Sequence, residues 1–151
     1  MRIIVVSSGT SAPPFAAELS REHDVAIVHD GEEAREELGK LDAEIIEGVG
    51  TDASILKRAG VKDASYFVAW TRSDEINIIS CLTAKRLGDP HTICCVEKEE
   101  YVRTFGGNGG AKGSPDLGID TLIWPAWRLA DRRQYLRQRS SERGTGPAIP
   151  D

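Results

Sequence analysis

Short runs of β-branched and aliphatic residues alternate with longer helix-forming segments along almost the whole chain. The apolar runs predict strands at residues 2–6, 24–28, 44–47, 65–69, 92–96 and 121–123. Most are continuously apolar, which is typical of strands covered on both faces. The segments between them predict helices at residues 13–22, 32–40, 53–59, 74–87 and 99–105, and a last helix at about 126–137.

Repeated strand–helix–strand units with right-handed crossovers give parallel strands. The pattern therefore predicts one Rossmann-like, doubly wound α/β domain, with a mostly parallel six-stranded sheet and helices on both faces. We assign this domain to residues 1–137. Residues 138–151 are polar with Gly and Pro and are expected to be a disordered tail. The glycine-rich segment 106–116 is expected to be a long loop, mobile or functional.

Composition narrows the classes of function. The chain has 151 residues with a net charge of −5, so nucleic acid is not expected as the main partner, because phosphate binding needs a dense basic surface. No apolar run approaches the length of about 18 residues that spans a bilayer, and the N-terminus reads as a strand rather than a signal peptide. Three cysteines fit no disulfide framework, so we expect a cytoplasmic protein.

The loop after the first strand lies where Rossmann domains carry G-x-G-x-x-G to bind phosphate. The spacing here reads S-x-G-x-x-A, from Ser7 through Gly9 to Ala12. A serine at position 7 costs about 1–2 kcal/mol if that turn needs a positive φ. Hydroxyl donors from Ser8, Thr10 and Ser11 partly compensate, and Pro13 suits a first helical turn. The alternative is a turn that has lost its ligand.

The end of the second strand is the other diagnostic position, where an acidic residue binds the adenosine ribose. His29 takes the place of that acid, and Asp30 follows it. Asp30 bends back to the ribose, or His29 selects a different adenine nucleotide, or Asp30 only caps the helix predicted from residue 32.

The middle of the chain is more distinctive than the glycine loop. It runs GTD at residues 50–52, DASYFVAWTRSDEIN at 63–77 and CLTAKRLG at 81–88, and the domain closes with GIDTLIWP at 118–125. This succession resembles the RCK or KTN domain (TrkA N-terminal type), the nucleotide-binding regulatory domain of prokaryotic potassium channels and Trk/Ktr transporters. The resemblance covers residues 1 to about 137.

The resemblance implies a cytoplasmic subunit, peripheral to the membrane, that binds NAD(H), ATP, ADP or AMP, forms dimers or larger homo-oligomers, and gates a membrane potassium transporter or channel. Matched position by position, it assigns ligand binding to four turns at the carboxyl ends of parallel strands. These turns contribute Ser7, Ser8, Gly9, Thr10, Ser11 and Ala12; His29 and Asp30; Thr51 and Asp52; and Thr71 and Arg72.

Several residues depart from the family pattern. Ser7 and His29 replace the usual glycine and acid, and Cys94-Cys95 stands where an arginine is common. A scaffold subunit with a degenerate pocket is therefore a competing function. Replacing Ser7 by glycine is expected to strengthen nucleotide binding if the pocket is merely weakened, and to change nothing if it is occluded.

Three other features are open to two interpretations. Thr71 and Arg72 contact the ligand, or they only precede a helix capped by Ser73. Cys94 and Cys95 point to opposite faces of a strand and, like Cys81, are expected to be buried rather than to bind a metal. The last predicted helix is basic on one side and aromatic on the other. Its basic face is solvated and its aromatic face packed against the domain, or its aromatic residues form a subunit contact, or its arginines approach acidic lipids; the family resemblance favours the subunit contact.

An enzyme is the least supported class. A small NAD(P)-dependent oxidoreductase needs a substrate pocket and an acid–base pair. The histidines are His23, His29 and His91, and of these only His29 lies at the predicted ligand edge. No catalytic residue and no metal site is predicted, and a ligand-sensing module is the function we expect.

Overall fold

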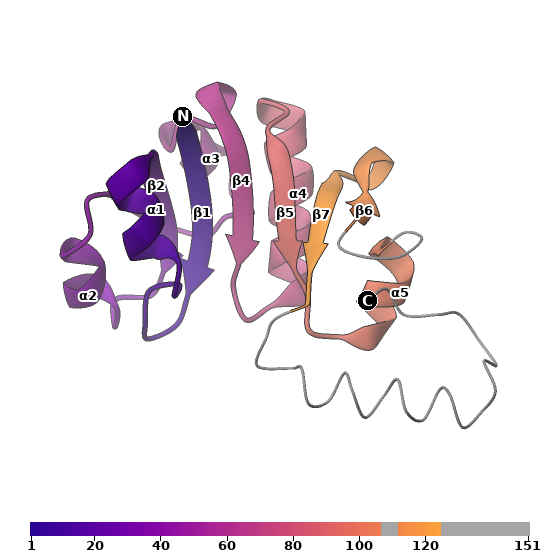
Figure 1. Ribbon diagram of the computed structural model, residues 1–151, viewed down its shortest axis with the longest axis horizontal. Helices are drawn as coiled ribbons and strands as arrows, with labels where there is room; N and C mark the ends of the chain where they lie inside the picture. The colour runs from indigo at the N-terminus through magenta and orange to yellow at the C-terminus, as the bar shows by residue number, and fades with distance from the viewer. Residues whose placement is uncertain (107–111, 125–151) are drawn as a thin grey trace.

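The computed structural model describes residues 1–106 and 112–124, in which strands and helices alternate (Figure 1). The strands are β1 (Arg2–Ser8), β2 (Asp24–Asp30), β3 (Glu44–Glu47), β4 (Ala64–Trp70), β5 (His91–Cys95), β6 (Lys112–Ser114) and β7 (Ile119–Ile123). The helices are α1 (Ala16–Glu22), α2 (Arg35–Gly39), α3 (Ala53–Arg58), α4 (Asp74–Leu87) and α5 (Glu99–Phe105), with short 3₁₀ turns η1 (Val61–Asp63) and η2 (Pro115–Leu117). The predicted α/β alternation is confirmed.

All strands but one join a parallel sheet in the order β3-β2-β1-β4-β5-β7-β6. β6 pairs antiparallel with β7 at one edge, so the sheet has seven strands rather than the predicted six. Residues 112–117 form β6 and η2, so the prediction of an unbroken loop at 106–116 was wrong there. A three-residue edge strand made of Lys, Gly and Ser carries no run of β-formers that a sequence reading detects.

Two hydrophobic layers cover the two faces of the sheet. One contains Ile4, Val28, Phe67 and Cys94 and packs against α3, α4 and α5. The other contains Ile3, Val5 and Ile27 and packs against α1 and α2. Figure 1 shows α1 in front of the sheet and α3 and α4 behind it. Helices on both faces explain why the strands read as continuous apolar runs.

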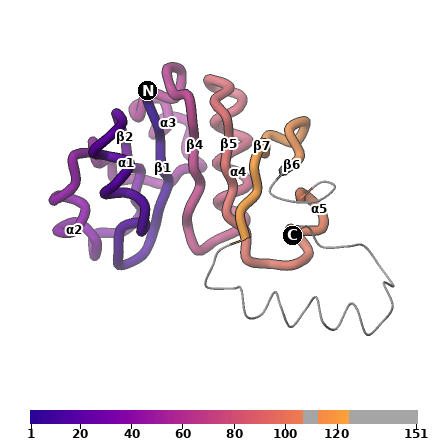
Figure 2. Tube along the Cα trace, in the orientation of Figure 1, coloured from indigo at the N-terminus to yellow at the C-terminus, as the bar shows by residue number. Residues whose placement is uncertain are grey.

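The chain reverses its direction across the sheet after β3. It runs from β1 to β2 and β3 on one side, then crosses to β4 and β5 on the other (Figure 2). The reversal places β1 beside β4, and the crevice at the carboxyl ends of two such strands is where open α/β sheets bind ligands.

Two helices begin later than predicted. α1 starts at Ala16, because residues 13–15 form a turn in which the amide of Ala16 bonds to the carbonyl of Pro13. α2 starts at Arg35 with Ala34 at its N-cap and no side-chain cap, so Asp30 does not cap it. The predicted helix at 126–137 and the tail at 138–151 lie outside the described residues. Within the described ranges no helix has the length and apolar character needed to cross a bilayer.

Candidate functional site

The loop after β1 adopts a different geometry from the one its sequence suggests. Ser7 belongs to β1 and pairs with His29 of β2, so its backbone is extended and the strain considered for a left-handed serine does not arise. Gly9 is the residue with a positive φ, of 93°, and a Cβ there would meet no atom within 4 Å. The backbone angle, not a lack of space, requires glycine at position 9.

Ser7 and His29, the two departures from the nucleotide fingerprint, bond to each other. Ser7 Oγ lies 2.6 Å from His29 Nδ1, and both side chains are buried. The other ring nitrogen, Nε2, lies 3.0 Å from the carbonyl oxygen of Gly9. A carbonyl only accepts, so Nε2 carries a proton, and in the neutral ring Nδ1 accepts from the Ser7 hydroxyl. His29 is thus engaged on both sides and locks β2 to the glycine loop.

A cavity of about 240 Å³ opens at the crevice between β1 and β4. Its walls bring together the loop after β1 and the turn after β4, and they consist of Ser7, Ser8, Ser11, Ala12, Pro13, Pro14, Trp70, Thr71 and Arg72. The ring of Trp70 is held edge-on by Phe15, with centroids 5.1 Å apart. Hydroxyl donors beside an arginine suit an anionic group. Six of the twelve predicted site residues line this cavity.

The turn after β4 is held by a residue that the sequence analysis did not single out. Asn77 is fully buried, and its Oδ1 accepts from the amide of Thr71 at 2.9 Å and from its hydroxyl at 2.7 Å. Its Nδ2 donates to the carbonyls of Thr71 and Cys95, at 3.1 and 2.8 Å. Ser73 caps α4, as predicted, by accepting from the amide of Ile76. The Thr71 side chain is therefore used to shape the turn, and Arg72 is placed by it.

Asp74 makes the matching connection to the next strand end. This buried carboxylate accepts from the amide of Glu97, at 2.9 and 3.1 Å, and from that of Lys98 at 2.8 Å. Asp74 and Asn77 together tie the turn beside the cavity to the turn between β5 and α5. The signal for both was present in the sequence: polar residues occupy positions 74 and 77 of a helical face that continues with Cys81 and Ala84.

The turn after β3 has a structural role. Asp52 is the N-cap of α3, and its carboxylate accepts from the amide and the hydroxyl of Ser54, at 2.9 and 2.7 Å. These hydrogen bonds lower the pKa of Asp52. Neither Thr51 nor Asp52 lines the cavity between β1 and β4.

Replacing Asp52 separates capping from ligand binding. We expect Asp52→Ala to lower the thermal midpoint and Asp52→Ser, which keeps a capping oxygen, to preserve it. Because the folded pKa is depressed, the wild-type advantage is present above the ordinary value of about 3.9 and is lost as the pH falls through the folded value. Thermal unfolding between neutral and acidic pH measures this. If Asp52→Ser unfolds like wild type yet loses nucleotide binding, Asp52 contacts the ligand.

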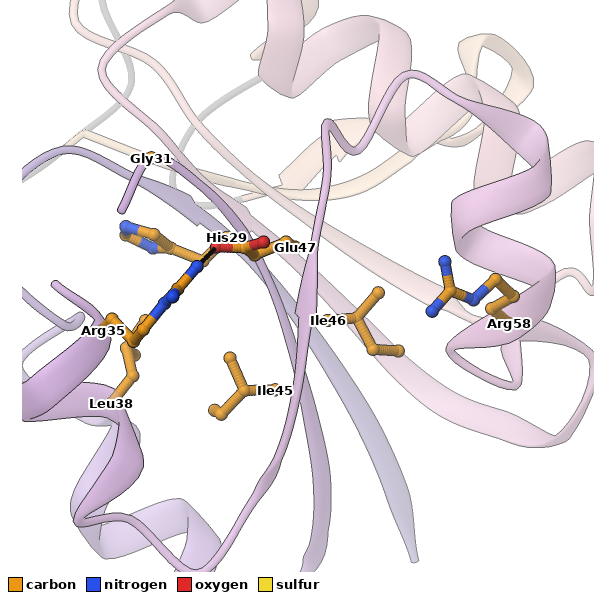
Figure 3. A pocket seen from close by; sticks show the side chains of 8 residues that line it. All are labelled: His29, Gly31, Arg35, Leu38, Ile45, Ile46, Glu47 and Arg58. Atoms are coloured by element: carbon orange, nitrogen blue, oxygen red, sulfur yellow. Dashed lines mark hydrogen bonds and ion pairs between the residues drawn. The ribbon is translucent and has the colours of Figure 1, made fainter. Parts of the chain in front are cut away.

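A second cavity, of about 500 Å³, surrounds the edge strand β3. Figure 3 shows Arg35 reaching from α2 to Glu47, its ion-pair partner, near His29, with Arg58 on the other side of the strand. His29 lines this cavity while its partner Ser7 lines the smaller one, so the Ser7–His29 pair lies between the two. Asp30 is exposed at the end of β2.

The other histidines lie away from the carboxyl edge of the sheet, and the cysteines are buried. His23 follows α1 and His91 begins β5, both at the amino edge. All three cysteines are buried. Burial raises the pKa of the Cys95 thiol. The pKa of the Cys81 thiol is also raised, first by a hydrogen bond with Cys94 and then by burial. Within residues 1–106 and 112–124 no cluster of His, Cys, Asp or Glu is arranged to hold a metal ion.

Comparison with known proteins identifies relatives of the chain. Residues 3–123 match the TrkA-N domain family. The chain is 36% identical over 137 residues to a Trk system potassium uptake protein TrkA homolog of Archaeoglobus fulgidus, covering 90% of this chain and 30% of the relative. It is 31% identical over 139 residues to the Trk system potassium uptake protein TrkA of Halomonas elongata, and this match also covers 90% of this chain and 30% of the relative. The chain thus spans about a third of these relatives, which are named as potassium uptake proteins rather than enzymes.

Solved structures share the fold. A GsuK channel bound to NAD superposes with a TM-score of 0.64 at 22% identity, over 88% of this chain and 23% of that one. GsuK bound to ADP superposes with a TM-score of 0.62 at 22% identity, over 91% of this chain and 35% of that one. These similarities confirm the Rossmann-like architecture.

Proposed function

The chain belongs to the TrkA-N domain family, and from that membership we propose that it binds an adenine nucleotide or dinucleotide at the carboxyl edge of its sheet and thereby regulates a membrane potassium transporter or channel. The observation that carries the proposal is the cavity between the loop after β1 and the turn after β4. It lies at the reversal of strand order, where Rossmann domains hold the phosphates of their ligands.

The residues present suit the phosphate end of such a ligand. Gly9 leaves the space beside its Cα open, and Ser8, Ser11 and Arg72 line the cavity. Because α1 begins only at Ala16, hydroxyls, loop amides and Arg72 supply the anion donors here. Because GsuK structures that share this fold hold NAD and ADP, both ligands are the first candidates.

The ribose end departs from the common pattern. His29 has both ring nitrogens engaged and cannot act as the acid that receives the ribose hydroxyls. We assign that role to Asp30, the exposed last residue of β2 and the carboxylate nearest in the chain to the usual position. The remaining predicted site residues, Thr10 and Thr51, stay assigned to the ligand's surroundings.

Regulation follows from differential binding. A nucleotide that binds two arrangements of an assembly unequally shifts their populations, and each tenfold preference corresponds to about 1.4 kcal/mol. We place the chain in the cytoplasm, held at the membrane by its transporter or channel.

Thermal unfolding with NAD⁺, NADH, ATP, ADP and AMP tests the proposal. A ligand at a hundred times its dissociation constant adds about 2.7 kcal/mol, which raises the midpoint by several degrees. We expect Ser8→Ala/Ser11→Ala and Arg72→Ala each to abolish most of that shift, while Ser65→Ala and Arg21→Ala, at exposed positions away from the cavity, retain it. No shift with any nucleotide at millimolar concentration identifies a scaffold subunit instead.

A further inference from the structure

The strand β3 lies at one edge of the sheet, and within the described residues it pairs with β2 alone. The amide of Gly48, which follows β3, bonds to the carbonyl of His29 in β2. The N–H and C=O groups of successive strand residues point to alternate sides, so those of Ile46 also face β2, whereas those of Ile45 and Glu47 face outward. A row of outward backbone groups is a template for pairing with another extended chain. We call this outer side of the strand the β3 edge.

The cavity of about 500 Å³ leaves room for such a chain on both sides of β3. Ile45 belongs to the hydrophobic layer under α2, and Arg35 and Leu38 of α2 border the cavity on that side. Ile46 belongs to the opposite layer, and Arg58 at the end of α3 borders the cavity there (Figure 3). The side chains of an added strand alternate between the two faces of the sheet, so they meet an apolar surface and open space on each face.

The surroundings of the β3 edge carry the excess negative charge of the whole chain. Residues 30–47, from the end of β2 through α2 to the end of β3, include eight acidic and two basic residues, a net charge of −6, whereas the whole chain has −5. All eight acidic residues are exposed. Arg35 is ion-paired with Glu32 and Glu47, so its charge is already compensated. The resulting field attracts a positively charged partner and opposes an anionic one.

We propose that the β3 edge binds an extended segment of another protein, rich in lysine or arginine, as an additional strand of the sheet. Backbone hydrogen bonds to Ile45 and Glu47 provide affinity, and the acidic surroundings select a basic sequence. Cytoplasmic segments of membrane proteins carry an excess of lysine and arginine, so a membrane partner is the source that suits this chemistry. That source rests on the regulatory function proposed above, whereas the binding of a basic strand does not depend on nucleotide binding.

Binding of a synthetic peptide to the full chain, without nucleotide, tests the proposal. The probe is a short capped peptide that alternates lysine with valine, titrated by calorimetry. We expect it to bind, and to bind less tightly as the salt concentration rises. The same peptide with glutamate in place of lysine is expected not to bind. If the lysine peptide does not bind, or if the glutamate peptide binds equally well, the proposal is wrong.

A third peptide separates strand pairing from attraction between charges. It keeps every lysine and valine but is N-methylated at each residue, which removes the backbone donors and leaves the charge unchanged. We expect it not to bind. Binding as tight as that of the unmethylated peptide would show that the attraction is electrostatic alone, and the added strand would be excluded.

Hydrogen exchange locates the contact on the protein. The lysine–valine peptide is expected to slow the exchange of the Ile45 and Glu47 amides, which face outward, much more than that of the Ile46 amide, which faces β2. Slow exchange of the outward amides before any peptide is added would mean that the chain itself or a second copy already covers the β3 edge, and would overturn the proposal.

Charge reversal on α2 provides a matched pair of variants. Glu36→Lys/Glu37→Lys changes two exposed residues of α2 and is expected to weaken binding of the lysine–valine peptide roughly tenfold. Glu100→Lys/Asp116→Lys makes the same change in net charge at exposed positions near the opposite edge of the sheet, and is expected to bind as wild type does. Equal weakening in both variants would assign the effect to the net charge of the chain rather than to the β3 edge, and would contradict the proposal.

Discussion

Replacing Asn77 by alanine is expected to lower the free energy of unfolding by about 3 kcal/mol. The substitution removes the acceptor of the Thr71 amide and the amide donor to the Cys95 carbonyl. Each buried polar group left unpaired costs about 1–3 kcal/mol. Urea unfolding measures the loss. Thr83→Ala on the same helix removes a hydroxyl that bonds to the carbonyl of Ile79 in that helix, and it is expected to stay within about 0.5 kcal/mol of wild type.

The Asn77→Ala variant also tests whether a residue that does not line the cavity affects nucleotide binding by positioning one that does. Asn77 lines neither cavity, yet it fixes the turn that places Arg72. We therefore expect Asn77→Ala to weaken nucleotide binding at a temperature where the protein is still folded. Thr83→Ala is expected to bind as wild type does. An Asn77→Ala protein of wild-type stability would show that the Asn77 hydrogen bonds contribute nothing to the turn.

Sequence patterns predicted the fold almost completely. All six predicted strands exist, and their observed ends lie within two residues of the predicted ones. They could be predicted because parallel strands buried on both faces are continuous apolar runs in the sequence. α4 was placed without error because Ser73 is a strong N-cap before a regular apolar face. β6 was missed since its three residues have no apolar pattern, and α1 was begun too early because Pro13 is as suitable for a turn as for a helix start.

The site was less accessible to sequence reasoning. Ser7 and His29 were recognised as departures, but 22 positions separate them and no local pattern indicates that they bond. Only the parallel register of β1 and β2 sets them opposite each other. Asn77 was not singled out, although a polar residue on the buried face of α4 is a signal of its own. Ser7 and His29 look in the sequence like two separate losses from the nucleotide-binding fingerprint, but in the structure they form one hydrogen bond.

The Ser7–His29 bond reverses the expected effect of restoring glycine at position 7. Ser7→Gly alone removes the partner of His29 Nδ1, a buried nitrogen, and is expected to lower the free energy of unfolding by about 1–3 kcal/mol. Glycine within a strand adds roughly 0.5–1 kcal/mol to the loss. Nucleotide binding is not expected to improve, since His29 still stands where the ribose acid belongs.

Changing both residues together is expected to have the opposite outcome for binding. Ser7→Gly/His29→Asp recreates the glycine and acid of the dinucleotide fingerprint, and we expect NAD⁺ to bind roughly tenfold more tightly than to wild type, which corresponds to about 1.4 kcal/mol. Calorimetric titration of the four proteins of this cycle measures the affinities, and urea unfolding measures their stabilities. Residues in contact couple by about 0.5–3 kcal/mol. Additive changes in stability would mean that Ser7 and His29 act independently, and the bond between them would then not explain why both depart from the fingerprint.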